Sequence, residues 1–210
     1  VFDYIDGGAE DEITLRANAA AYRRRRFAPR VLRDVSVVDT SVSLFGRTLS
    51  LPLVLAPTGF TRIAHPSGEL AVARAAARAH VPYCLSTVAT RSIEEVATAS
   101  DGERWFQLYL FRDRELVRDL VQRAAASGYS VLMPTVDMPR PGQRERDVRS
   151  GFTLPPKLGP EIIIDGIRHP GWTWRFLRSE PILFANLRGR SVGDGTTAVA
   201  LADFIATQFD

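Results

Sequence analysis

The sequence has few cysteines, lysines and histidines, and each shortage argues against a class of site. Cys84 is the single cysteine among 210 residues, so no intramolecular disulfide framework can form, and a reducing cytoplasm suits such a chain. Lys157 is the single lysine, the net charge is only +3, and the arginine runs lack interleaved aromatic residues, which argues against a nucleic-acid surface. The three histidines, His65, His80 and His169, are too scattered to predict a metal site.

Long apolar runs and nucleotide-binding glycine motifs are also missing. No stretch approaches the roughly 18 apolar residues of a membrane-spanning helix. No G-x-G-x-x-G follows a predicted strand and no P-loop is present, which argues against the dinucleotide-binding and NTPase versions of an α/β fold. No signal peptide is visible, although the sequence starts at Val1 and not at Met.

A repeating order of apolar runs and helical segments begins at residue 51. The alternating pattern predicts four strands and three helices: strands at 51–59, 83–88, 104–110 and 130–137, and helices at 67–80, 92–99 and 113–128. Ser92 and Glu95 have the spacing of a capping box. Before residue 51, the acids and arginines of 9–27 suit the two ends of a helix, and 41–50 predicts a hairpin around Phe45-Gly46.

The predicted strands are continuously apolar, which is typical of strands buried on both faces of a parallel sheet. Four β–α steps fit either a doubly wound sheet or the first half of a (β/α)8 barrel. We therefore predict an α/β chain in which 1–50 flank the sheet, 51–137 form the four β–α units, and 138–210 form a long lid with two short helices. No fifth strand is predicted, so we expect the chain to be a fragment whose remaining strands are absent.

Polar residues gather at the predicted carboxyl ends of the strands, the edge at which parallel α/β folds bind ligands. They are Pro57, Thr58 and Gly59; Ser86 and Thr87; Gln107 and Tyr109; and Thr135 and Asp137. Ser, Gln and Thr side chains suit the edge of a planar heterocycle rich in nitrogen and carbonyl groups, and a tyrosine phenol suits a substrate hydroxyl or carbonyl.

The stretch after the last predicted strand is rich in arginine and reads either as a basic surface loop or as a pocket for a small anion. Asp137 would accept hydrogen bonds only and could orient a histidine. Arg144 offers a fork that matches a carboxylate, whereas we interpret Arg146 as structural or solvated. No general base is visible at the strand ends, so a complete acid–base enzyme is not predicted from these residues.

These stretches resemble the FMN-dependent α-hydroxy-acid dehydrogenases and oxidases. The resemblance spans about the first 157 residues in order and is carried by "FDYIDGGAEDEITLRAN", "PRVLRDVS", "LPLVLAPTGF", "HPSGELAVARAAA", "LSTVATRSIEEVA", "WFQLYLFRDR" and "TVDMPRPGQRERDVRSGFTLPP". The later "HPGWTWRFLRSEPILFANL" is most similar to bacterial quinone-linked L-lactate dehydrogenases.

The resemblance implies an FMN-binding (β/α)8 barrel, and it implies a role for each candidate residue. Pro57, Thr58 and Gly59 would border the flavin, and Ser86, Gln107 and Thr135 would hydrogen-bond its ring system. Tyr4 and Arg144 match positions that hold the substrate carboxylate. Tyr109 matches the phenol beside the substrate hydroxyl, and Asp137 matches the carboxylate that supports the catalytic histidine.

The resemblance further implies the oxidation of L-lactate to pyruvate, with electrons passing to flavin and then to a quinone. In the family, the histidine, a second arginine, a flavin-facing lysine and the phosphate-binding loops belong to the later half of the barrel. We therefore expect residues 1–210 alone to be inactive. A cytoplasmic homo-oligomer, commonly a tetramer in the family, is expected, with peripheral contact at the inner face of the membrane if the acceptor is a quinone.

Two departures from the family pattern bear on substrate and acceptor. Val88 stands where plant glycolate oxidases carry tryptophan, which argues against glycolate, and Gly59 stands where several oxidases carry alanine, which favours an acceptor other than oxygen. An oxygen-using oxidase of an aromatic hydroxy acid such as mandelate is the alternative within the family. A non-catalytic half-barrel that binds a partner or an anion is the alternative from another class.

Overall fold

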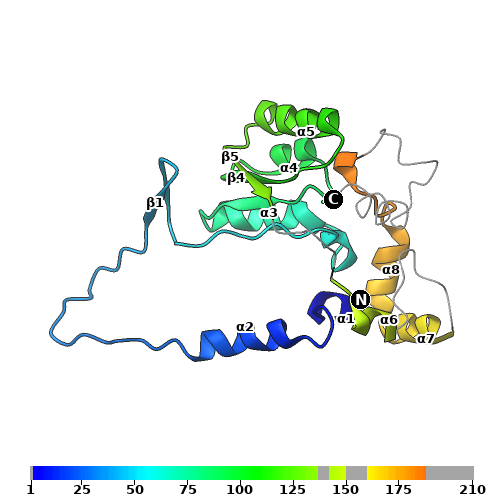
Figure 1. Ribbon diagram of the computed structural model, residues 1–210, viewed down its shortest axis with the longest axis horizontal. Helices are drawn as coiled ribbons and strands as arrows, with labels where there is room; N and C mark the ends of the chain where they lie inside the picture. The colour runs from blue at the N-terminus through cyan, green and yellow to red at the C-terminus, as the bar shows by residue number, and fades with distance from the viewer. Residues whose placement is uncertain (1, 137–141, 150–159, 188–210) are drawn as a thin grey trace. The chain divides into compact units, whose positions relative to one another are not determined.

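The computed structural model describes residues 2–136, 142–149 and 160–187. The chain divides into two compact units, one of residues 1–40 with 141–153 and the other of residues 41–140 with 154–210. Figure 1 shows both units and labels their α-helices and several of their strands. The three-part division predicted from the sequence stays a prediction.

The first unit is helical. It contains α1 (Phe2–Asp6), α2 (Ile13–Arg23) and α6 (Glu145–Arg149). The predicted helix within 9–27 is confirmed as α2, which begins after Glu12, a residue in the left-handed conformation with φ 56°. The five-residue α1 was not predicted because it is too short to show an apolar period.

The predicted hairpin is confirmed as β1 (Val42–Leu44) and β2 (Arg47–Leu49), which pair antiparallel. Its two turn residues, Phe45 and Gly46, have φ values of 48° and 73°. A two-residue turn with positive φ at both positions matches the right-handed twist of the strands. Glycine adopts that conformation without strain, which is why Gly46 marks this turn in the sequence.

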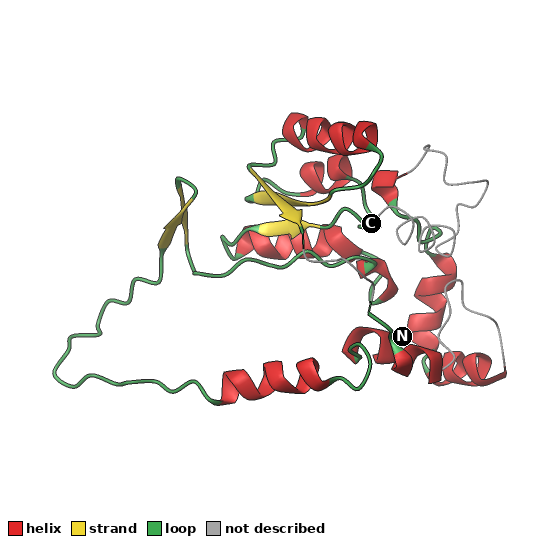
Figure 2. Cartoon of the chain, in the orientation of Figure 1, coloured by secondary structure: helices red, strands yellow, loops and turns green. Residues whose placement is uncertain are grey.

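The second unit is built on a three-stranded parallel sheet in the order β3-β4-β5, drawn in yellow in Figure 2. Its strands are β3 (Tyr83–Leu85), β4 (Arg104–Tyr109) and β5 (Val131–Thr135), and α3 (Gly68–Arg78), α4 (Ile93–Ala99) and α5 (Arg114–Ala126) alternate with them along the chain. The α/β prediction with a parallel sheet is therefore confirmed. The alternation is that of part of a (β/α)8 barrel, and the strands described do not form a closed barrel.

The two faces of this sheet differ in chemistry. Because side chains alternate along a strand, Leu85, Phe106 and Leu108 lie on one face, where they join a core with residues of all three helices, namely Ala73, Ala76, Ile93, Val96, Leu116, Leu120 and Ala124. Cys84 and Met133 lie on the opposite face, with their sulfur atoms 3.5 Å apart. Gln107 pairs in register with Met133, so the polar residues of the candidate site belong to this second face.

The predicted strand at 51–59 is wrong as a strand. Among the described residues, only a single parallel bridge from Leu55 to Tyr83 marks its place beside β3. Pro52 and Pro57 have no N–H to donate to a ladder, and Leu51 and Leu53 are exposed. The segment follows the sheet edge without forming a continuous ladder.

The prediction that every strand is buried on both faces is wrong for β5. The side chains of Leu132 and Met133 are 43% and 37% exposed, whereas β3 is buried throughout. In the part of the chain that the structure describes, β5 pairs only with β4, so it is an edge strand and its apolar residues lack the cover that a central strand receives.

Two short helices were expected in the long segment 138–210. Its described residues hold three, because α6 precedes α7 (Pro160–Arg168) and α8 (Pro170–Arg178). A 3-10 turn, η2 (Ala185–Leu187), then returns to the core of the second unit, where Leu187 is buried. The Ala185 N–H donates to the carbonyl of Ala89 at 3.1 Å. Among the described helices, none is long and apolar enough to span a bilayer.

Candidate functional site

Gln107 is the centre of a hydrogen-bonded cluster at the carboxyl end of the sheet. Its side chain is buried; the carbonyl oxygen Oε1 accepts from the Ser86 hydroxyl at 3.3 Å and from the Thr87 N–H at 3.2 Å. Its amide nitrogen Nε2 donates to the Thr135 hydroxyl at 2.7 Å. Three residues that were predicted to face a ligand therefore lie together. Ser86 follows β3, Gln107 is in β4, and Thr135 ends β5.

Thr87, to which the sequence interpretation assigned no role, supports this cluster from within. It is completely buried; its hydroxyl donates to the carbonyl of Gln107 at 2.6 Å and accepts from the Tyr109 N–H at 3.1 Å. The Thr87 hydroxyl thus bonds to the backbone of β4 beyond Leu85, where the backbone pairing of β3 with β4 ends. The only signal in the sequence was its place directly after Ser86 at a strand end.

Pro57, Thr58 and Gly59 lie in the loop that follows the bridge at Leu55, and Thr58 is exposed. At Gly59, an added Cβ would come within 2.7 Å of a Val88 methyl group. A side chain at residue 59 would therefore have to shift the Val88 side chain, so Val88 restricts the size of the residue at this position. That the three residues border a flavin stays a prediction.

Tyr109 and Asp137 were predicted to serve the substrate and a histidine. Tyr109 ends β4 and is partly buried, with its ring 6.0 Å from that of Phe111. Asp137 lies outside the described residues, so its predicted role stays a prediction.

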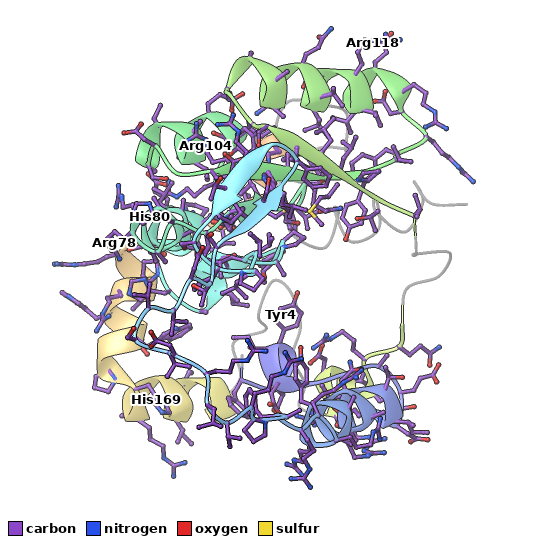
Figure 3. All side chains as sticks on the ribbon, turned by 90° about the vertical axis from the view of Figure 1, so that its left-hand side faces the viewer. Tyr4, Arg78, His80, Arg104, Arg118 and His169 are labelled. Carbon is purple, nitrogen blue, oxygen red and sulfur yellow. The ribbon has the colours of Figure 1, made fainter. Side chains whose placement is uncertain are left out.

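Tyr4 and Arg144 lie together in the first unit. The Arg144 guanidinium lies over the Tyr4 ring, 4.8 Å from its centroid, and donates through Nη2 to the backbone carbonyl of Tyr4. Its Nε donates to the Asp147 carboxylate at 2.6 Å. Burial raises the pKa of the Tyr4 phenol above its ordinary value, while the positive charge of Arg144 partly opposes that rise. Figure 3 labels Tyr4 on α1.

Arg146 was interpreted as structural or solvated, and its contacts with two carboxylates fit the structural alternative. Its Nη1 donates to Asp6 at 2.7 Å and its Nη2 donates to Glu12. These two ion pairs join α6 to the last residue of α1 and to the residue that precedes α2. The stretch 142–149 is therefore not simply a solvated basic loop, and Arg144 and Arg146 have different partners in it.

Three buried polar residues were not predicted as parts of the site. Asn186 accepts from the Ile93 N–H at 2.9 Å and donates to the carbonyl of Thr87 at 3.4 Å. Arg62 donates to the carbonyls of Glu180 and Pro181 in the same returning segment, and Glu69 binds Thr90. No pattern in the sequence could identify them, because their partners lie 21 to 119 residues away.

No metal centre is formed by the described residues. No group of three His, Cys, Asp or Glu side chains is placed to hold a cation within ranges 2–136, 142–149 and 160–187. His80 follows α3 and His169 lies between α7 and α8, as Figure 3 shows. The second unit by itself offers neutral hydrogen-bonding groups. The first unit by itself offers an arginine with a tyrosine.

Comparisons with known proteins give a family model and several relatives. The family model described as FMN-dependent dehydrogenase matches residues 1–210. An L-lactate dehydrogenase of Pseudomonas syringae pv. syringae (strain B728a) is 42% identical over 211 residues, which cover 100% of this chain and 55% of the relative. Glycolate oxidase 1 of Zea mays is 48% identical over 157 residues, which cover 75% of this chain and 42% of the relative.

Among solved structures, one described as the monotopic membrane protein (S)-mandelate dehydrogenase superposes with a TM-score of 0.91 at 36% identity, covering 100% of this chain and 55% of that one. The chain spans about half the length of the curated relatives it matches.

Proposed function

Because the chain belongs to the FMN-dependent dehydrogenase family, we propose that it is part of an enzyme that oxidises an L-2-hydroxy acid, with L-lactate as the substrate and pyruvate as the product. FMN is the cofactor of this family. Among the relatives are proteins named for lactate and for glycolate, so the family alone does not single out one acid.

The observation that carries the proposal is the hydrogen-bonded chain from Ser86 through Gln107 to Thr135. These side chains are neutral, they come from three neighbouring strand ends, and they offer both donors and acceptors. Such a set fits the nitrogen and carbonyl edge of an isoalloxazine ring better than it fits a metal ion or a phosphate group. Ser86, Gln107 and Thr135 are therefore the residues that would hold the flavin ring, bordered by Pro57, Thr58 and Gly59.

When bound, FMN supplies an acceptor for the two electrons that leave the α-carbon of the hydroxy acid. Arg144 and Tyr4 bind the substrate carboxylate, because a guanidinium fork and a phenol match its two oxygens. Tyr109 binds the substrate hydroxyl or the product carbonyl. Asp137 orients the catalytic histidine, which the family carries in the later half of the barrel. That histidine takes the hydroxyl proton, and the Asp137 carboxylate stabilises the imidazolium formed.

Oxidation of an aromatic hydroxy acid by oxygen is the second candidate. The mandelate dehydrogenase and mandelate oxidase structures support it, since the oxidases reach 46–47% identity over 73% of this chain. Val88, a small residue beside Gly59, would leave room for a substrate side chain larger than that of glycolate. Gly59 favours a dehydrogenase over an oxidase in our proposal.

The acceptor that we propose is a quinone, with the enzyme in the cytoplasm and peripherally bound to the inner face of the membrane. α7 and α8 present exposed apolar side chains, namely Ile163, Ile164, Ile167, Trp172, Trp174 and Leu177. Arg168, Arg175 and Arg178 lie in the last turns of these helices. Apolar and basic side chains together suit an interface of anionic lipid, and the similar mandelate dehydrogenase is described as monotopic. A homo-oligomer, commonly a tetramer in the family, is part of the same proposal.

Anaerobic flavin reduction tests the function. The full-length protein should purify with a flavin absorbance, and L-lactate should bleach it faster than glycolate, D-lactate or (S)-mandelate. Faster reoxidation by a water-soluble quinone than by air-saturated buffer supports the dehydrogenase. Faster bleaching by (S)-mandelate with rapid reoxidation by oxygen supports the second candidate, and a protein that binds no flavin contradicts both.

A further inference from the structure

Arg144 makes three contacts with the protein: two hydrogen bonds and one cation–π contact. Its Nε donates to Asp147 Oδ2 at 2.6 Å, its Nη2 donates to the backbone carbonyl of Tyr4, and its guanidinium lies over the Tyr4 ring at 4.8 Å. The Asp147 side chain is only 13% exposed, whereas that of Arg144 is 37% exposed. The carboxylate therefore supports the arginine from the protein side, and the arginine keeps access to solvent.

Asp147 accepts a hydrogen bond from Nε of Arg144 and not from a terminal nitrogen. This choice decides which N–H groups remain for a ligand. Arg146, two residues on, is bound through both terminal nitrogens, Nη1 by Asp6 and Nη2 by Glu12. Arg144 instead donates hydrogen bonds through Nε and Nη2. Its Nη1 donates to no acceptor in the part of the chain that the structure describes. Both terminal nitrogens of Arg146 thus donate to carboxylates of the protein, while Arg144 retains Nη1 for a ligand.

Fixing Nε also fixes the direction of those remaining donors. A guanidinium is planar, so a short bond at Nε and the ring beneath it together determine the plane in which Nη1 and Nη2 point. A carboxylate ligand gains both affinity and a defined orientation when its two oxygens meet two parallel N–H groups. An arginine that is already oriented loses less side-chain freedom when the ligand arrives.

We propose that Asp147 is a positioning residue for the substrate, acting through Arg144: it holds the guanidinium plane so that the terminal N–H groups left over from the Tyr4 contact, those of Nη1 above all, meet the carboxylate of the hydroxy acid. This inference rests on the proposed function, in which Arg144 binds that carboxylate. Asp147 touches neither substrate nor flavin in this role, and its effect falls on substrate affinity and not on electron transfer.

The test measures anaerobic flavin reduction in the full-length, FMN-loaded protein with the hydroxy acid that reduces it fastest. Asp147→Ala should raise the apparent Kd roughly tenfold, the size expected for one hydrogen bond to a charged group. The limiting reduction rate should stay within about twofold. Asp147→Asn, which retains an oxygen that can accept from Nε, should fall between the parent and Asp147→Ala. Should Asp147→Ala fold poorly, Asp147→Asn alone decides the outcome by the same comparison.

Glu145→Gln is the matched control, because Glu145 lies on the same helix but pairs with Arg149 instead of Arg144. It should leave both constants unchanged. In an Arg144→Ala background, Asp147→Ala should add no further loss of affinity, because the group that it positions is gone.

Two results separate the inference from the function on which it rests. If Arg144→Ala weakens binding while Asp147→Ala does not, or if Asp147→Ala lowers the limiting rate as much as the affinity, the positioning role is overturned and the proposed function stands. If Arg144→Ala leaves the affinity unchanged, the carboxylate-binding role of Arg144 fails and the inference fails with it.

Discussion

The carboxylate of Glu69 lies in the fully buried core and binds Thr90 twice. Its Oε1 accepts from the Thr90 N–H at 2.8 Å, and its Oε2 lies 2.6 Å from the Thr90 hydroxyl. Glu69 is in the first turn of α3, and Thr90 lies in the loop between β3 and α4. The pair joins α3 to the loop that also carries Ser86 and Thr87.

Replacing Thr90 by valine should destabilise the protein by about 1–3 kcal/mol, because one oxygen of a buried carboxylate loses its hydroxyl partner while the side-chain volume is kept. Urea denaturation followed by circular dichroism measures the change. Thr98→Val is the control, since that hydroxyl is exposed and donates to carbonyls within its own helix; it should change stability by less than about 0.5 kcal/mol. Equal effects of the two substitutions would contradict a special role for the Glu69 pair.

Replacing Gln107 by leucine should weaken FMN binding more than it weakens folding. The substitution keeps the buried volume but removes the acceptor for Ser86 and the donor to Thr135. Titration of the flavin-free, full-length protein with FMN measures the affinity, and we expect a loss of roughly tenfold or more. A leucine variant that binds FMN like the parent would count against the proposed flavin edge.

Replacing Ser92 by alanine should cost about 1 kcal/mol, the usual worth of an N-cap. The Ser92 hydroxyl accepts from the Glu95 N–H at 3.1 Å, and the Glu95 carboxylate accepts from the Ser92 N–H at 2.7 Å. Ser100→Ala at the other end of α4 is the matched control, because its hydroxyl makes one long bond of 3.4 Å. Denaturation midpoints that fall equally for both would argue against the capping box.

Glu94 should make the stability depend on pH on the acid side. A hydrogen bond from Arg123 lowers the pKa of this carboxyl from 4.5 to about 2. A lowered folded pKa means that the stabilisation is present above pH 4.5 and is lost as the pH falls towards 2. Glu94→Gln should therefore be less stable than the parent at neutral pH, and the difference should vanish near pH 2.

The effect of Glu94 should be small and should shrink in high salt, since its side chain is 49% exposed. Asp101→Asn serves as the control, because Asp101 is exposed and forms no ion pair among the described residues. Denaturation at several pH values compares the two variants with the parent. A Glu94→Gln difference that persists unchanged at pH 2 would contradict the assignment.

Cys84 should be unreactive in the folded protein. Its side chain is 0% exposed, and burial raises the pKa of the thiol to about 12, so the thiolate that reacts with alkylating reagents is scarce. Iodoacetamide at pH 8 should leave the native protein unmodified and add one label per chain in urea, as measured by intact mass. Rapid labelling without denaturant would show that the sheet opens at β3.

The local features of the fold could be predicted because each depends on residues close in sequence. Ser92 and Glu95 cap the same helix turn, Phe45 and Gly46 form one turn, and the alternation of apolar runs with helical segments already indicates a parallel sheet. The same holds for the strand ends, since parallel strands bring their carboxyl ends to one edge. Ser86, Gln107 and Thr135 were expected at that edge, and the structure brings these three together.

Other features depend on which residues meet across the fold, and no local pattern carries that information. An apolar run such as 131–135 reads as a buried strand, and only its place at the sheet edge exposes Leu132 and Met133. Pairs such as Glu69 with Thr90 or Asn186 with Ile93 join residues 21 and 93 positions apart. The sequence by itself determined the order of elements and the residue types available for chemistry. The tertiary structure decided which of them are buried and paired, because burial and hydrogen bonding over long separations exist only once the elements have packed.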